Sequence, residues 1–506
     1  MRAALKLPFV LEAEDNEHLP TGGAPARSGL AAKPNETIST VLFWTFLGGL
    51  AWCPYRYGGT GLLAWGINAV LFPGLAALYE ISLLATGERH PVAVKEIRIS
   101  AALFVAVMIW IIVQNATWTP TSWHHPIWGM AADALGKPIA GSISVNRDLT
   151  TLALMRLITA ASVFWLALQL CRKASRAKQF MMGISVISCG YAAYGLISFA
   201  LASEPASWYG NTPVRGFETT TFMNPDHYAT YAGIGLVTMG GLIFQFYLYE
   251  VATVGGSLGY RIARIIEATG QRGIVLLGAA FLVFVTLLLT GSRAGIMATG
   301  LAIVVLSAPC FARQKVNPHR IRKAKVSGPL FVLLGLFAIG TAIVLAFGDA
   351  FFARLVELDL THDPRMAVYL ITLRSIFDAP LLGYGYGTFM DVFPMFRDRS
   401  ISVEGVWQQA HNTYLEVFQG LGLVFGSMLV ASIVLLFLKC YKGTTARREG
   451  FAVPAIAASA ACLVGVHALV DFSLQVQAVA LTLTAILGAG VAQSKRSRLT
   501  VSDHNG

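Results

Sequence analysis

The run "NTYLEVFQGLGLVFGSMLVASIVLLFL", residues 412–438, decides the class of fold, because it contains one acidic residue, Glu416, and no basic residue. An α-helix needs about 20 apolar residues to cross the hydrocarbon core of a bilayer, and this run is longer. Lipid offers no partner to free backbone N–H and C=O groups, so the run is predicted to be a membrane-spanning helix.

Comparable runs recur along the whole chain, whose 506 residues are 55% hydrophobic and only 13% charged. This composition excludes an ordinary soluble domain and predicts an all-α, polytopic integral membrane protein. We expect about twelve transmembrane helices, near 38–53, 61–85, 99–115, 151–171, 180–202, 225–249, 273–291, 294–311, 328–347, 412–438, 453–470 and 475–492.

The apolar runs and the polar segments between them predict five regions. They are a disordered cytoplasmic tail at 1–37, transmembrane helices 1–9 at 38–347, a large loop on the outer face at 348–411, transmembrane helices 10–12 at 412–492, and a second cytoplasmic tail at 493–506. Within the large loop we expect a short helix from Pro364 to Phe377, because proline is favoured in the first turn of a helix.

The net charge of +11 is explained by orientation in the membrane. Most Lys and Arg residues fall in the short segments on one side, such as 312–326, and this asymmetry follows the positive-inside rule. We therefore predict that both termini are cytoplasmic and that the long segments 115–150, 203–224 and 348–411 lie on the outer face of the membrane. A nucleic-acid partner is not expected.

No cofactor and no metal site are predicted. The six cysteines are scattered, and His124 and His125 lack a third ligand nearby, so segment 115–150 is better interpreted as an aromatic belt along the membrane interface. The glycines in "GYGYG", residues 383–387, do not have the spacing of a nucleotide-binding loop.

Ionisable residues within the predicted spans are few, and such residues are candidates for function because charge is costly in a membrane. They are Glu80, Arg156, Glu416, His467 and Asp471.

Two arginines lie at predicted outer turns, where arginine is disfavoured by topology. Arg293 opens a span in "LTGSRAG" (289–295), and Arg215 precedes the span that begins near residue 225. A guanidinium group suits phosphate, because its planar fork makes bidentate, permanently charged hydrogen bonds. The alternative for Arg293 is a side chain that extends to the membrane interface with no anionic partner, and the alternative for Arg215 is a charge solvated in its loop.

The stretch "AHNTYLE", residues 410–416, places His411 at the outer boundary of the membrane. A histidine with a pKa near neutrality can accept a proton from a hydroxyl nucleophile. Thr413-x-x-Glu416 has the form of a capping box, so the start of a helix would explain both residues. Arg365 and Tyr369 are one turn apart on the predicted short helix and can face the same site.

Taken in order, "LTGSRAG", "PLLGYGYGTF", "AHNTYLEVFQGLG" and "HALVDFSLQV" make residues 210–490 resemble the O-antigen ligase and O-antigen polymerase family of bacterial membrane glycosyltransferases. The resemblance implies a GT-C-like fold with catalytic residues at Arg215, Arg293 and His411. It carries Asp471 over as the late acidic residue of the family, and it implies a bacterial inner membrane with the outer segments in the periplasm. We also expect Asp471, Arg365, Tyr369 and Asn412 to bind the substrate. The chain departs from the family pattern at Phe425, which affects helix packing rather than the histidine.

The resemblance also implies the reaction. A glycan linked to undecaprenyl pyrophosphate would pass to an acceptor hydroxyl, with inversion and without a metal ion, because pyrophosphate is a good leaving group. The acceptor would be lipid A-core in a ligase or a second lipid-linked glycan in a polymerase, and a protein acceptor is a third version. A transporter or flippase for lipid-linked sugars would instead need functional charge at the middle of the membrane. A non-catalytic assembly component would tolerate loss of the histidine.

Overall fold

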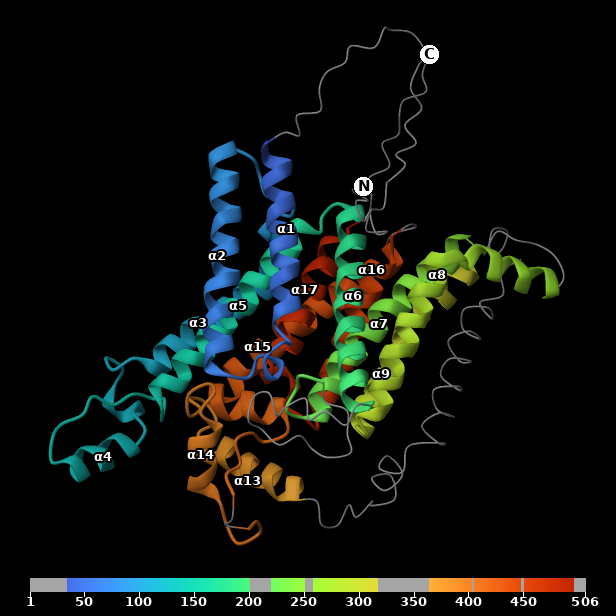
Figure 1. Cartoon of the computed structure of the whole chain (residues 1–506). Coiled ribbons are helices and arrows are strands. Elements are labelled where there is room, and N and C mark those ends of the chain that lie inside the picture. The colour runs from blue at the N-terminus through green and yellow to red at the C-terminus, as the bar shows by residue number, and fades with distance from the viewer. Residues whose placement is uncertain are drawn as a thin grey trace, which may run out of the picture.

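A computed structural model describes residues 34–200, 220–250, 258–316, 364–402, 405–446 and 450–495. Within these ranges every regular element is a helix, which confirms the predicted all-α class (Figure 1). Arg215 and the predicted span at 328–347 lie outside the described residues.

The other predicted apolar runs all coincide with helices. These are α1 (Pro34–Trp52), α2 (Leu62–Thr86), α3 (Arg98–Asn115), α5 (Arg147–Leu170), α6 (Ala174–Ala200), α7 (Pro225–Glu250), α8 (Leu258–Leu289), α9 (Arg293–Val316), α15 (Thr413–Ala446), α16 (Ala452–His467) and α17 (Gln477–Ala492). Among the described residues, six helices are long and apolar enough to cross a membrane, and several shorter apolar helices accompany them. The protein is thus a multi-pass membrane protein, and the predicted total of twelve spans stays a prediction.

Helix α7 lies in the middle of the bundle, with 89% of its apolar window buried. Glycines let its neighbours approach closely. A Cβ atom at Gly241 would lie 2.2 Å from Ile456 of α16, and one at Gly235 would lie 2.5 Å from Ser188 of α6. Such small-residue contacts are how helices pack where lipid gives no hydrophobic drive for association.

Helix α15 is interrupted at Gly422, whose φ of 75° and ψ of 170° are outside the helical region. The "GYGYG" loop packs backbone to backbone against this interruption, since the Gly385 N–H donates to the Gly420 carbonyl over 3.1 Å. Its glycines therefore have a packing role. The Phe425 ring, which follows the interruption, stacks on Trp110 of α3 with ring centroids 4.5 Å apart.

Two short helices cover one end of the bundle, α13 (Pro364–Asp378) and α14 (Phe389–Phe396). Helix α13 confirms the helix predicted in the large loop. Figure 1 shows both helices at the end where α2, α5, α9 and α15 begin. A small apolar cluster joins them to the loop before α15, and it consists of Val368, Ile371, Phe389, Phe393, Ile401 and Ala410.

Segment 115–150 contains α4 (Ile127–Leu135) and a 3-10 turn, η3 (Thr121–Trp123). Figure 1 shows α4 projecting away from the bundle at the same end as α13. The His124 side chain is hydrogen-bonded to Thr119, with 3.0 Å between His124 Nε2 and Thr119 Oγ1. No group of three metal-ligating side chains occurs in the described part of the chain.

Candidate active site

His411 lies in the loop just before α15 and has an unusual backbone. Its φ of 54° is in the left-handed region, which only a few per cent of residues other than glycine adopt. The Tyr369 hydroxyl on α13 holds this conformation by donating to the His411 carbonyl oxygen over 2.9 Å. The predicted pair on α13 therefore does reach the histidine, through Tyr369.

The start of α15 differs from the predicted capping box. Asn412 is the cap, because its Oδ1 accepts from the Leu415 N–H at 3.1 Å. The Glu416 carboxylate accepts instead from the Ala410 N–H at 2.7 Å. Thr413 is buried and donates its own N–H to the Ala468 carbonyl over 2.9 Å. The capping-box prediction was wrong because three chain segments meet at this helix start and supply competing partners.

Asn412 also donates from Nδ2 to the Leu469 carbonyl oxygen over 2.8 Å. Its amide thus ties α15 to the end of α16 while it caps the helix. These two contacts give Asn412 a structural role in the fold. They do not support its predicted role in substrate binding.

Phe472 brings a second histidine into the site, one that the sequence did not single out. The His411 ring packs edge-on against Phe472 with centroids 4.8 Å apart, and the His227 ring does the same at 4.5 Å. His227 is on the first turn of α7, whose start is set by Pro225 and by Asn224, which accepts from the Asp226 N–H at 2.8 Å. It is only 4% exposed.

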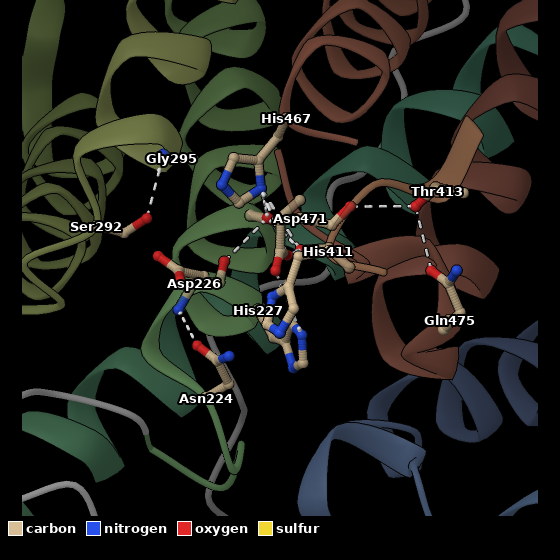
Figure 2. Close-up of polar contacts among 12 residues, drawn as sticks. Asn224, Asp226, His227, Ser292, Gly295, His411, Thr413, His467, Asp471 and Gln475 are labelled. Atoms are coloured by element: carbon tan, nitrogen blue, oxygen red, sulfur yellow. Dashed lines mark hydrogen bonds and ion pairs between the residues drawn. The ribbon is translucent and has the colours of Figure 1, made fainter. Parts of the chain in front are cut away.

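Asp471 lies between two buried histidines (Figure 2). Its Oδ1 is 3.8 Å from His227 Nε2, and its Oδ2 is 3.9 Å from His467 Nδ1. The Ser473 hydroxyl donates to Oδ2. Thr230 of α7 completes the cluster, since its hydroxyl lies 2.6 Å from His467 Nδ1 and thereby links α7 to α16.

Several buried polar atoms here lack a hydrogen-bond partner among the described residues. They are His411 Nδ1, His227 Nε2, His467 Nε2 and Asp471 Oδ1. Buried polar atoms are nearly always hydrogen-bonded in native proteins, so a group of such atoms at one place points to a functional site.

The surroundings of His411 favour its neutral form. Burial lowers the pKa of the His411 imidazole, and the positive charge of Arg365 lowers that pKa further. Asp471 and Asp226 act in the opposite direction but do not overcome these effects. A neutral imidazole is the form that can accept a proton.

The predicted arginines are placed differently from one another. Arg365 is on α13, half-buried and close enough to influence His411 electrostatically. Arg293 is exposed at the first residue of α9, after a turn in which Gly291 has a φ of 64° and Ser292 Oγ accepts from the Gly295 N–H. The structure thus gathers His411, Asp471, Tyr369 and Arg365 at one end of the bundle, with Arg293 at its surface.

What the sequence could not indicate is the partnership of residues far apart in the chain. The pattern Asn224-Pro225-Asp226 marks a helix start that places His227 one turn inside α7. Nothing in the sequence places that turn beside His411.

Comparison with known proteins supports the resemblance noted from sequence. Residues 278–431 match the family model described as O-antigen ligase. The match includes α9, α13, α14 and the first half of α15, and so contains Arg293, Arg365, Tyr369 and His411. No curated protein matches the chain significantly.

Proposed function

Because residues 278–431 form an O-antigen ligase family domain, we propose that this protein transfers glycan from an undecaprenyl-pyrophosphate-linked donor to an acceptor hydroxyl at the periplasmic face of the inner membrane. The family supports a membrane enzyme of ligase or polymerase type that acts on lipid-linked glycan. The donor, the acceptor and the assignment of residues belong to the proposal.

The observation that carries the proposal is the buried position of the His411 imidazole together with its lowered pKa. Its Nδ1 is buried without a partner in the described part of the chain, and its pKa is lowered by burial, so the imidazole is neutral at neutral pH. In the proposed reaction it accepts the proton of the acceptor hydroxyl while that oxygen attacks the anomeric carbon. The bond from this carbon to the pyrophosphate oxygen breaks, and the configuration at the carbon inverts.

The arginines are assigned to the leaving group. Negative charge grows on the pyrophosphate as the glycosidic bond breaks, and guanidinium groups stabilise phosphate oxygens through paired hydrogen bonds. Arg293 is suited to this task because it is exposed at the start of α9, where a lipid-linked pyrophosphate at the membrane surface can reach it. Arg215, which precedes α7, is assigned the same role by the family resemblance.

Asp471 is assigned to stabilise the charge on His411. When the imidazole takes up a proton it becomes positive, and the Asp471 carboxylate favours this charged form. His227, His467 and Ser473 hold the carboxylate in its buried position. Asp471 is thus a positioning residue in this proposal.

The test is to replace His411 by Ala in protein reconstituted into liposomes with defined undecaprenyl-pyrophosphate glycan and acceptor. We expect glycan transfer to fall by about 10² to 10⁴, the usual contribution of a general base. His90→Ala is the matched control, since His90 is half-exposed and pairs with Glu80 near the far end of α2. Unchanged transfer by His411→Ala would exclude the base assignment.

A polymerase is the second candidate, because the same family domain supports either type. The two differ only in the acceptor. Wild-type protein offered lipid A-core and a second lipid-linked glycan together should extend one of them in preference, and the product that grows decides between ligase and polymerase.

A further inference from the structure

A separate cavity lies inside the bundle beside the His411 loop. Its volume is about 140 Å³, and α5, α15, α17 and η5 (Ser473–Gln475) form most of its wall. Arg156 and Glu416, two of the ionisable residues expected within the spans, line it, whereas none of the described residues predicted for catalysis or substrate binding does. Its polar wall consists of Arg156, Tyr386, Gln408, Gln409, Glu416, Gln475 and Gln477 with Thr413.

Arg156 is the charged group of this cavity. Its guanidinium carbon lies 4.6 Å from the centroid of the Trp65 ring, and the guanidinium donates to the Gln475 carbonyl oxygen. Within the described ranges it makes no ion pair with a carboxylate. Glu416 is near enough to interact with it electrostatically. An intramembrane arginine is a candidate for function, because burying its charge is costly.

Glu416 faces the same cavity with acceptor capacity to spare. Its Oε1 accepts from the Ala410 N–H at 2.7 Å, and its Oε2 accepts from Gln475 Nε2 at 2.8 Å. Each carboxylate oxygen can accept a second hydrogen bond. Since Ala410 precedes His411, this wall of the cavity is tied directly to the loop that carries the histidine.

Gln477 adds a donor without a partner. Its Oε1 accepts from Asn68 Nδ2 at 2.7 Å, but its Nε2 has no hydrogen-bond partner in the described structure, although the residue is only 2% exposed. A buried amide N–H₂ of this kind is costly unless a ligand or water accepts from it.

These groups match a sugar ring better than they match an anion or a lipid chain. Sugar hydroxyls both donate and accept, so they suit a wall that combines a guanidinium, a carboxylate and several amides. An ionised phosphate offers only acceptor oxygens, so it could not pair with the acceptor oxygens of the Glu416 and glutamine side chains, and an acyl chain would leave all the polar groups without partners. The cavity is smaller than the ~300–1,000 Å³ pockets that take a whole drug-sized ligand, so it fits one ring of a larger substrate.

The position of the cavity assigns it to the acceptor. In the view of Figure 2, Ser292, which precedes Arg293, and Gln475, which lines the cavity, are drawn on opposite sides of His411. In a single displacement the attacking oxygen and the leaving group lie on opposite faces of the anomeric carbon. If the pyrophosphate is on the Arg293 side, the acceptor oxygen comes from the side of the cavity.

We propose that the cavity lined by Arg156, Glu416 and Gln477 binds the sugar of the acceptor next to the hydroxyl that reacts. This inference rests on the proposed glycosyl transfer. It assigns a specificity site to α5 and α17, which lie outside the matched family region.

The test uses Arg156→Gln, which removes the charge, and Ala480→Leu, which fills the cavity without removing a polar group. Arg147→Gln is the matched control, because Arg147 is on the same helix and also stacks on a tryptophan, Trp128, but does not line the cavity. In steady-state transfer we expect both cavity variants to raise the KM for the acceptor about tenfold or more, and to leave the KM for the donor unchanged.

Direct binding separates this inference from the proposed reaction. The probes are the core oligosaccharide released from lipid A and the repeat-unit glycan released from its lipid, each titrated without donor into protein in nanodiscs. One of them should bind wild type and Arg147→Gln alike, and about tenfold or more weakly to Arg156→Gln and Ala480→Leu. Equal binding to all four proteins, or no binding of either probe to wild type, overturns the inference.

Two further outcomes are informative. A raised KM for the donor alone would show that the cavity binds the donor and not the acceptor, and would also overturn the inference. Full transfer by His411→Ala, combined with weakened oligosaccharide binding by Arg156→Gln, would remove the proposed base and leave the sugar site in place.

Discussion

At the scale of single residues, the site depends on the orientation of His411. A residue other than glycine in the left-handed region costs about 1–3 kcal/mol, so the surrounding structure must hold it there. The Tyr369 hydroxyl and the ring of Phe472 do so from two different parts of the chain. The sequence indicated His411 and Tyr369 as candidates, but the contact between them required the fold.

The charge on Asp471 is predicted to set the pH dependence of transfer. Asp471 favours the protonated form of His411, so Asp471→Asn should lower the pKa of His411 further. Because the neutral imidazole is the active form, the acid limb of kcat/KM against pH should then move to lower pH. We expect kcat/KM at neutral pH to fall about tenfold, since the imidazolium formed during reaction loses a stabilising charge.

Arg365→Gln is expected to shift the pH profile in the direction opposite to Asp471→Asn. Arg365 lowers the pKa of His411, so its removal should raise that pKa and move the acid limb to higher pH. Acid limbs that do not move in either variant would show that His411 is not the group that titrates.

At the scale of elements, apolar length was sufficient to locate the helices, and local sequence was not sufficient to cap them. The predicted run at 412–438 became α15, Thr413–Ala446. Its cap is nevertheless Asn412, because the Glu416 carboxylate bonds to the Ala410 N–H and to Gln475. A capping box considers only neighbours in sequence, whereas here the competing donors come from the preceding loop and from η5.

The interruption of α15 is predicted to be essential for stability. In Gly422→Ala the added Cβ would lie 2.4 Å from the Leu381 carbonyl oxygen, in a backbone conformation that alanine avoids. We expect the free energy of unfolding to fall by about 1–3 kcal/mol, measured as a lower Tm in detergent. Gly300→Ala is the control, because a Cβ there meets no atom within 4 Å, and its Tm should not fall. Equal Tm values for the two variants would contradict this account.

At the scale of the whole molecule, the site residues lie at one end of the bundle, where α13 and α14 cover it (Figure 1). The charge asymmetry of the sequence predicts that this end faces the periplasm. The orientation follows from where Lys and Arg lie along the chain, so it is a prediction that a labelling experiment can decide.

In intact cells, a membrane-impermeant thiol reagent should modify Ser400→Cys, since Ser400 is exposed in the loop after α14. Thr445→Cys, exposed at the far end of α15, should react only after the membrane is opened. The native Cys53, Cys171 and Cys440 are buried, and replacing Cys310 together with the half-buried Cys189 and Cys462 removes the other native thiols as background. Labelling of Thr445→Cys alone in intact cells would reverse the predicted topology.

The sequence by itself determined that this is an all-helical membrane protein and that His411 precedes a long span, because apolar length and the cost of unpaired backbone groups in lipid are properties of local sequence. The sequence also contains the motifs by which it resembles the family. Only the tertiary structure decided that His227, Asp471 and Phe472 surround His411, and that Arg156, Glu416 and Gln477 share one cavity. Such partnerships join residues from 60 to 321 positions apart in the chain, and they are set by how α5, α7, α15 and α17 pack together.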